Sequence, residues 1–196
     1  AQAILKEPRL RERIPEILCM GGSATSGNFS AAAEFNIYVD PEAAKIVFES
    51  GIPIRMVGLN LTRQNRIMPK DVDEIASVGN RVSDFAAEML RFSAGEDGRC
   101  SICDACTVVW LIDPEIIPKS LKVHVDVETK GEFTRGMTVC DWREYMGTDP
   151  IRDISHEMEC ESPFEGMKAP NVEVAMEFDQ ARFKKLLMDT LRSYGE

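Results

Sequence analysis

Apolar positions along the chain alternate between the spacing of strands and the spacing of helices. The short apolar runs at 17–20 and 53–59 are typical of buried parallel strands, whose two faces are both covered. Strict alternation over 121–127 predicts another strand, and 134–139 is expected to pair with it as a hairpin. A last strand is predicted over 172–176.

Other stretches carry apolar residues at helical spacing. The pair Asp40-Pro41 is a strong helix start, because the carboxylate caps the first turn and proline fits the first helical position. Helices are predicted over 41–50, 71–92, 104–112 and 179–191. Strands that alternate with helices and then give way to a hairpin predict an α/β fold. Its open sheet should be mostly parallel, mixed at one edge and flanked by helices.

The first residues follow a helical pattern that has no start signal. Residues 1–7 contain no initiator methionine, no capping residue and no turn. We therefore expect residue 1 to be a cut or an ordering boundary, with N-terminal strands of the sheet missing. On this interpretation residues 1–196 form a single domain that is incomplete at its N-terminus. The strand at 17–20 would then lose a neighbour and expose its edge.

Composition narrows the classes of partner. The formal charge of −10 argues against nucleic acid or an anionic membrane, because both require a basic surface. No apolar run approaches the roughly 18 residues that span a membrane, and no secretory signal is visible. Six cysteines without such a signal favour free thiols in a reducing compartment, so a cytoplasmic protein is expected.

Polar residues follow the predicted strands where ligands bind in parallel sheets, beyond the carboxyl ends. The loop after the first strand contains Gly22, Gly27, Asn28, Glu34 and Asn36. Taken singly, these residues are ordinary for a solvated turn. The glycines lack the Lys-Ser/Thr that a phosphate-binding P-loop requires.

The ordered set of motifs is more specific than its members. The chain reads MGG at 20–22, GN at 27–28, AEFN at 33–36 and DPEAA at 40–44. Downstream it reads GLNLT at 58–62, CDA at 103–105 and VETKGEFTRG at 127–136. In this order and spacing the chain resembles the calcium-dependent nucleoside hydrolases, and the resemblance extends from Ala1 to the C-terminus.

The resemblance implies hydrolysis of the N-glycosidic bond of ribonucleosides to free base and ribose. In that family a Ca²⁺-bound water, deprotonated by an aspartate, attacks through an oxocarbenium-like transition state. The resemblance makes Asn28, Glu34 and Asn36 partners of the ribose hydroxyls, and Met20 and Phe35 apolar walls. It also implies a homodimer or homotetramer, and it leaves the preferred base undetermined.

Two further site residues lie side by side. The resemblance makes Asp104 a calcium ligand. Cys103 stands where the family usually has histidine. Some nucleoside hydrolases resemble this chain in having cysteine there, so we interpret Cys103 as the mark of a subgroup of the family. Contact with the departing base and simple lining of the pocket both remain possible for Cys103. Neither His124 nor His156 is placed to replace that histidine.

The largest departure from the family is the absence of its N-terminal DxDxGxDD cluster. Without it, the chain has one matching metal carboxylate and no general base, so the chain alone is expected to be inactive and to bind Ca²⁺ weakly. A truncated, non-catalytic remnant is one alternative. Another is a thiolate–metal protein, in which Cys100, Cys103 and Cys106 bind zinc with a fourth ligand such as Cys140.

Overall fold

The computed structural model describes residues 1–145 and 166–195 and shows a central four-stranded sheet. Its strand order is β1-β2-β6-β3, where β1 (Ile17–Met20), β2 (Ile54–Val57) and β6 (Val172–Glu177) are parallel. The edge strand β3 (Lys119–Val123) runs antiparallel to β6. The predicted α/β fold, with a mostly parallel sheet that is mixed at one edge, is therefore confirmed.

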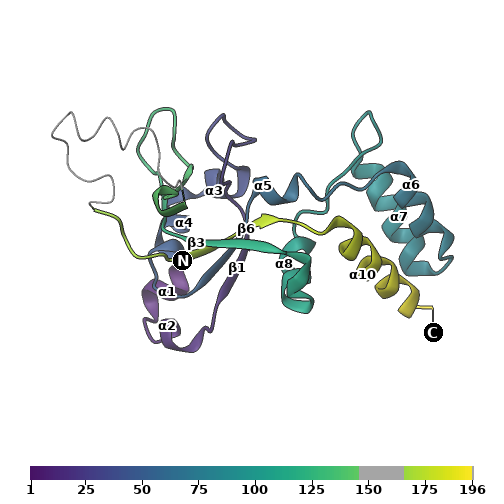
Figure 1. Ribbon diagram of the computed structural model, residues 1–196, viewed down its shortest axis with the longest axis horizontal. Helices are drawn as coiled ribbons and strands as arrows, with labels where there is room; N and C mark the ends of the chain where they lie inside the picture. The colour runs from purple at the N-terminus through teal and green to yellow at the C-terminus, as the bar shows by residue number, and fades with distance from the viewer. Residues whose placement is uncertain (146–165, 196) are drawn as a thin grey trace.

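Helices gather at both ends of this sheet (Figure 1). Helices α6, α7 and α10 lie at one end, and α1 to α4 lie at the other. The helical bounds are α1 (Gln2–Lys6), α2 (Leu10–Arg13), α3 (Phe35–Val39), α4 (Pro41–Phe48), α5 (Leu59–Thr62), α6 (Pro69–Ser77), α7 (Arg81–Ser93), α8 (Ala105–Ile112), η1 (Pro114–Ile116), η2 (Arg143–Tyr145) and α10 (Gln180–Ser193). Among the described residues, none of these helices is long and apolar enough to cross a bilayer.

The core has two parts, one on each face of the sheet. Val57 and Ala175 join a cluster with α5 to α8 and α10, while Met56 and Val174 join a cluster with α3, α4 and the strands β4 (Val125–Val127) and β5 (Thr138–Cys140). Neighbouring residues of one strand point to opposite faces, so each central strand supplies both clusters. The apolar run at 53–59, predicted as a doubly covered strand, fits this arrangement at β2, whereas the run at 17–20 forms β1, which is half-buried.

Two of the predicted helix starts are confirmed in detail. The carboxylate of Asp40 accepts a hydrogen bond from the N–H of Ala43 at 2.9 Å, and Pro41 occupies the first turn of α4. Asp179 accepts from the N–H of Arg182 at 2.9 Å and caps α10. These caps satisfy backbone donors that the first helical turn leaves without partners.

The expectation of one helix over 71–92 is wrong. The segment forms two helices, α6 and α7, which pack against each other. Gly79 adopts φ of +73°, which ends α6, and the side chain of Asn80 accepts from the N–H groups of Val82 and Ser83 at 3.0 and 2.9 Å. A left-handed glycine followed by a capping asparagine stops one helix and starts the next.

The expectation of one strand over 121–127 is also wrong. The chain changes partner at His124: Val123 pairs with Val172 in the main sheet, and Val125 pairs with Cys140. The strand β4 (Val125–Val127) and its partner β5 (Thr138–Cys140) form a separate antiparallel pair. Of the segment 121–127, only β4 makes the expected hairpin pairing. Its partner β5 begins at Thr138, later than the predicted start at 134.

The first strand lies at the other edge of the sheet. Within residues 1–145 and 166–195, β1 pairs only with β2, and its four residues are half-buried. The helical pattern before it forms two short helices, in which Ile4 is buried and Leu5 is exposed.

Candidate functional site

The loop that follows β1 lies against the segment that follows β2. The N–H of Leu59 donates to the carbonyl of Gly22 at 2.9 Å, and Gly22 itself adopts φ of +71°. A Cβ atom at Gly22 would approach Cγ2 of Thr138 to 2.6 Å, which is closer than real contacts allow. Only glycine fits this turn without a shift of β5. The loop is therefore closely held at the carboxyl ends of β1 and β2.

Glu34 fastens this loop to α3. Its side chain is buried, and its carboxylate accepts from the N–H groups of Gly22 at 2.9 Å, Asn36 at 2.9 Å and Ile37 at 3.2 Å. Three backbone donors on one carboxylate satisfy the start of a helix and fix the loop at the same time. Glu34 therefore positions the loop after β1 relative to α3.

Two exposed amides flank Glu34. The Oδ1 atom of Asn28 accepts from the N–H of Phe35 at 2.9 Å, which leaves its NH₂ group as a donor. The Nδ2 atom of Asn36 donates to the carbonyl of Met20 at 3.3 Å and to its sulfur at 3.2 Å, which leaves an acceptor. The two side chains thus offer a donor and an acceptor, the combination that a hydroxyl group requires.

Aromatic side chains border these amides. The ring of Phe35 is exposed, and its centroid lies 5.9 Å from that of Phe29. The Phe29 ring in turn stacks on Tyr38, with 4.1 Å between the ring centroids. The structure therefore brings together five predicted residues around the loop: Met20, Asn28, Glu34, Phe35 and Asn36. We call this set the amide cluster.

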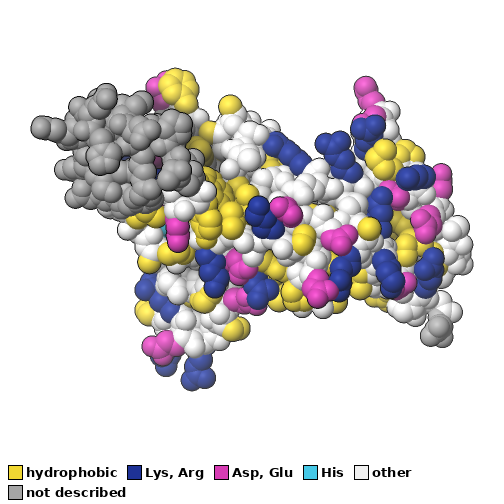
Figure 2. All heavy atoms as spheres, viewed as in Figure 1, with side chains coloured by type: hydrophobic (Ala, Val, Ile, Leu, Met, Phe, Trp, Pro, Cys, Tyr) yellow, Lys and Arg dark blue, Asp and Glu magenta, His cyan; other side chains and the backbone are white. Residues whose placement is uncertain are grey.

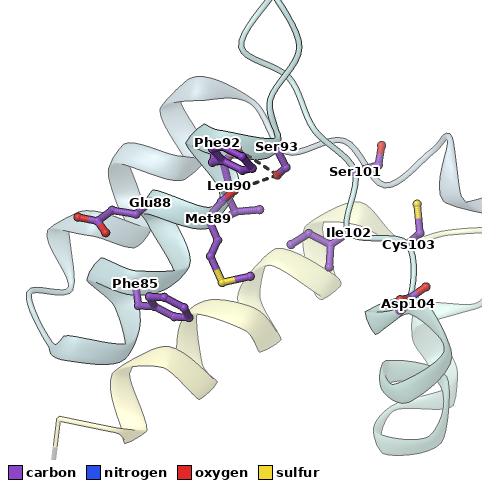
Figure 3. A pocket seen from close by; sticks show the side chains of 10 residues that line it. All are labelled: Phe85, Glu88, Met89, Leu90, Phe92, Ser93, Ser101, Ile102, Cys103 and Asp104. Carbon is purple, nitrogen blue, oxygen red and sulfur yellow. Dashed lines mark hydrogen bonds between the residues drawn. The ribbon is translucent and has the colours of Figure 1, made fainter.

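Cys103 and Asp104 lie just before α8 and line a groove of about 810 Å³. Figure 3 shows Phe85 and Met89 extending from α7 toward Ile102. Cys103 and Asp104 lie on the side of the groove opposite to α7. Asp104 is exposed, and its carboxylate makes no capping hydrogen bond to α8.

The amide cluster and this groove are neighbours but do not form one cavity. None of the five cluster residues lines the groove. Burial raises the pKa of the Cys103 thiol, and a hydrogen bond with Thr62 lowers it. The negative charges of Asp104 and Glu34 raise this pKa further. Helix α8 begins directly after Asp104. Helix α8 also contacts β1, whose last residue is Met20.

The cysteines do not support the thiolate–metal alternative. In the described part of the chain, no three His, Cys, Asp or Glu side chains are grouped to hold a metal. Burial raises the pKa of Cys106 to about 11 and that of Cys140 to about 12. The Cys106 thiol instead donates to the carbonyl of Ile102 at 3.3 Å.

Asp104 belongs to no group of three or more metal-binding side chains among the described residues. Asp104 is one carboxylate, whereas Ca²⁺ takes about six to eight oxygen ligands, so the described residues do not fit a calcium site by themselves. The Nδ1 atom of His124 lies 2.9 Å from the carbonyl of Ala169, away from both parts of the site. His156 lies outside the described residues.

Three residues that hold the site were not identified from the sequence. Asn60 accepts from the N–H of Ala24 at 3.1 Å and donates to the carbonyl of Ala175 at 2.9 Å. Arg63 donates to Ser26 and Gly27, and Thr138 exchanges hydrogen bonds with the backbone of Ser23. Asn60 stood in a quoted motif after a predicted strand, but nothing local marked Arg63 or Thr138.

Known proteins with similar sequences are nucleoside hydrolases. The model of the inosine-uridine preferring nucleoside hydrolase family matches residues 1–185. The pyrimidine-specific ribonucleoside hydrolase RihA of Klebsiella pneumoniae is 42% identical over 158 residues, which cover 76% of this chain and 50% of the relative. RihA of Escherichia coli K12 is 38% identical over 195 residues, covering 96% of this chain and 56% of the relative.

Solved structures agree with the sequence matches. A plant nucleoside hydrolase, PpNRh1, superposes with a TM-score of 0.79 at 27% identity, covering 97% of this chain and 57% of the plant enzyme. A purine-preferring ribonucleoside hydrolase from Gardnerella vaginalis gives 0.75 at 28% identity, covering 97% of this chain and 56% of that protein. The chain spans about half the length of the relatives it matches. By the extent of the family match and by its fold, this chain belongs to the inosine-uridine preferring nucleoside hydrolase family.

Proposed function

We propose that this chain supplies the ribose-binding part of an enzyme that hydrolyses the N-glycosidic bond of ribonucleosides. The observation that carries the proposal is the pair of exposed amides, Asn28 and Asn36, whose free donor and acceptor lie beside apolar Met20 and Phe35. Sugar hydroxyls both donate and accept, and a ribose carries apolar carbons as well. Membership of the family supports the same assignment.

Each residue of the amide cluster then has a distinct role. Asn28 and Asn36 bind ribose hydroxyls, and Met20 and Phe35 pack against the sugar. Glu34 keeps the loop and α3 in register through its three backbone hydrogen bonds, and it adds a charged acceptor on the ribose side. A fixed set of polar groups lowers the cost of orienting the substrate.

The groove beside Cys103 suits the departing base. Its wall includes Phe85 and Met89, which are 63% and 55% exposed and offer a flat aromatic face and a flexible apolar thioether. In the reaction, the bond from the anomeric carbon to the base nitrogen breaks, and its electron pair leaves with the base. Water adds to that carbon, and a proton reaches the base. The raised pKa of Cys103 keeps its thiol neutral, which suits a pocket wall or a weak donor and not a nucleophile.

We further propose that Asp104 contributes one carboxylate to bound Ca²⁺, as the resemblance to the family implies. The described residues group no further metal ligands around Asp104, and the sequence lacks the family's DxDxGxDD cluster. We therefore propose that the chain alone does not hydrolyse nucleosides. The substrate class that we propose is pyrimidine ribonucleosides, because the relatives at 38% and 42% identity carry that name. Assembly into a homodimer or homotetramer also remains a proposal.

Binding by the isolated chain tests the assignment of the amide cluster. We expect NMR titration with uridine to shift the signals of Asn28 and Asn36. Binding of 2′-deoxyuridine should be about tenfold weaker, because one polar contact is lost. Asn36→Ala should weaken uridine binding by a similar factor, while Gln2→Ala, an exposed amide on α1, should leave it unchanged. Equal binding of uridine and 2′-deoxyuridine, with no effect of Asn36→Ala, would contradict the proposal.

A further inference from the structure

Next to the candidate site lies a smaller cavity that the proposed function does not use. It measures about 340 Å³ and is lined by Arg63, Arg66, Asp97, Arg99, Cys100 and Ser101. We call it the arginine cavity. Figure 2 shows Lys and Arg side chains along this side of the molecule, over α5 and the loop that follows α7, with acidic side chains at the tip of that loop.

The arginine cavity has an excess of positive charge. Three arginines face one aspartate, and that aspartate pairs with Arg99 at 3.5 Å. Arg63 and Arg66 make no ion pair within the described ranges. The whole chain carries a formal charge of −10, so uncompensated guanidinium groups that share one cavity are not a consequence of a basic composition. Arg63 and Arg66 are exposed, so water screens part of the repulsion between the guanidinium groups, and an anion bound between them would lower it further.

Two of these guanidinium groups are held in place by neutral acceptors. Arg63 donates to the hydroxyl of Ser26 at 2.9 Å and to the carbonyl of Gly27 at 2.8 Å. The Nε atom of Arg66 donates to the carbonyl of Arg63 at 3.2 Å. A guanidinium has five N–H donors, so most donors of both side chains stay available. The side chains are therefore positioned for an acceptor without being neutralised by one.

The arginine cavity also borders both parts of the candidate site. Ser101 lines this cavity and the groove of Cys103. On the other side, Arg63 is bonded to Gly27, the residue before Asn28. An anion bound here would lie beside the surface that we assign to the nucleoside.

We propose that the arginine cavity binds a phosphate group, either inorganic phosphate or a phosphate monoester. A phosphate dianion has several acceptor oxygens, and the planar fork of arginine matches them with paired hydrogen bonds. Phosphate binding does not depend on nucleoside hydrolysis and would stand if this protein cleaved no nucleoside.

Calorimetric titration of the chain at low ionic strength tests the proposal. The ligands are inorganic phosphate, ribose 5-phosphate and uridine 5′-monophosphate, with uridine as the ligand that lacks phosphate. We expect Arg66→Gln and Arg99→Gln each to weaken phosphate binding about tenfold, since each removes a charge-assisted contact. The matched control is Arg91→Gln, since Arg91 lies on α7 and pairs with Asp73 at 3.1 Å.

The ligands also distinguish the two sources of phosphate. Equal affinities for inorganic phosphate and the monoesters identify a site for free phosphate, whereas tighter binding of the monoesters identifies a phosphorylated ribose. Absence of heat with all three phosphate ligands would overturn the proposal. So would equal weakening by Arg91→Gln, because binding would then reflect net charge alone.

Discussion

Glu34 joins two segments of the candidate site that are 12 residues apart, Gly22 and the start of α3. The replacement Glu34→Gln keeps one acceptor oxygen but presents an NH₂ group to backbone N–H donors. We expect it to lower the free energy of unfolding by about 1–3 kcal/mol, because buried donors lose their acceptor. Urea denaturation measures this difference.

The control for this experiment is Glu132→Gln, an exposed position whose change should stay within about 0.5 kcal/mol. Equal stabilities of the Glu34 variant and this control would show that the three backbone contacts of Glu34 do not hold the loop.

At the same scale, the sequence identifies site residues better than it identifies their contacts. The resemblance pointed to Asn28, Glu34 and Asn36, which lie together in the structure. The hydrogen-bond partners of these side chains are backbone groups. The residue type at a position does not predict a contact made by its backbone. The bond between Ser23 and Thr138 joins residues 115 apart, so it depends on the docking of β5 and not on any local signal.

At the scale of elements, the errors of prediction lie at breaks. The valines at 123, 125 and 127 are all buried, so the alternation continues although the chain changes sheets at His124. The side chain of Asn171 makes this possible, since it accepts from the N–H of Val125 at 2.8 Å and donates to its carbonyl at 3.0 Å. By contrast, the break between α6 and α7 had a visible signal in Gly79-Asn80. This signal was missed because apolar residues recur at helical spacing both before and after it.

The contact between α6 and α10 gives a prediction on pH. Asp71 accepts from Lys184 at 2.6 Å and from the N–H of Met68 at 2.8 Å. Burial alone would raise the pKa of Asp71, but these two bonds outweigh it and hold the pKa below its usual value. A lowered pKa contributes stability above the unfolded value of about 3.9, and this stability is lost as the pH falls through the folded pKa.

We therefore expect Asp71→Asn to destabilise the chain at pH 7 and to have a diminishing effect below about pH 4. Unfolding free energies measured from pH 7 to pH 3 test this. Asp73→Asn, whose side chain is 74% exposed and pairs with Arg91, is the control and should have little effect at any pH. A difference between wild type and Asp71→Asn that is constant over this range would refute the account.

At the scale of the whole molecule, apolar surface lies next to an unpaired strand. Val108, Leu111 and Ile112 on α8 are 54%, 55% and 63% exposed, and α8 contacts β1, which has one free edge among the described residues. Unpaired strand edges and apolar stripes favour association. We expect the 196-residue chain to self-associate and to bind hydrophobic dyes.

Light scattering measures this association directly. Leu111→Lys should reduce it, whereas Phe133→Lys, at a position that is 80% exposed in another part of the fold, should not. A compact, dye-silent monomer of 21.9 kDa would show that this surface is stable in water.

The central claim is that this chain forms the ribose-binding part of a nucleoside hydrolase. The most direct measurement is release of uracil from uridine, followed by chromatography in the presence of Ca²⁺. The protein to test is a chimera in which this chain replaces the matched 56% of E. coli RihA. We predict hydrolysis by the chimera, about a hundredfold loss with Asn36→Ala, and none by the chain alone. A chimera that folds like RihA, as judged by circular dichroism and thermal melting, but releases no uracil would contradict the claim.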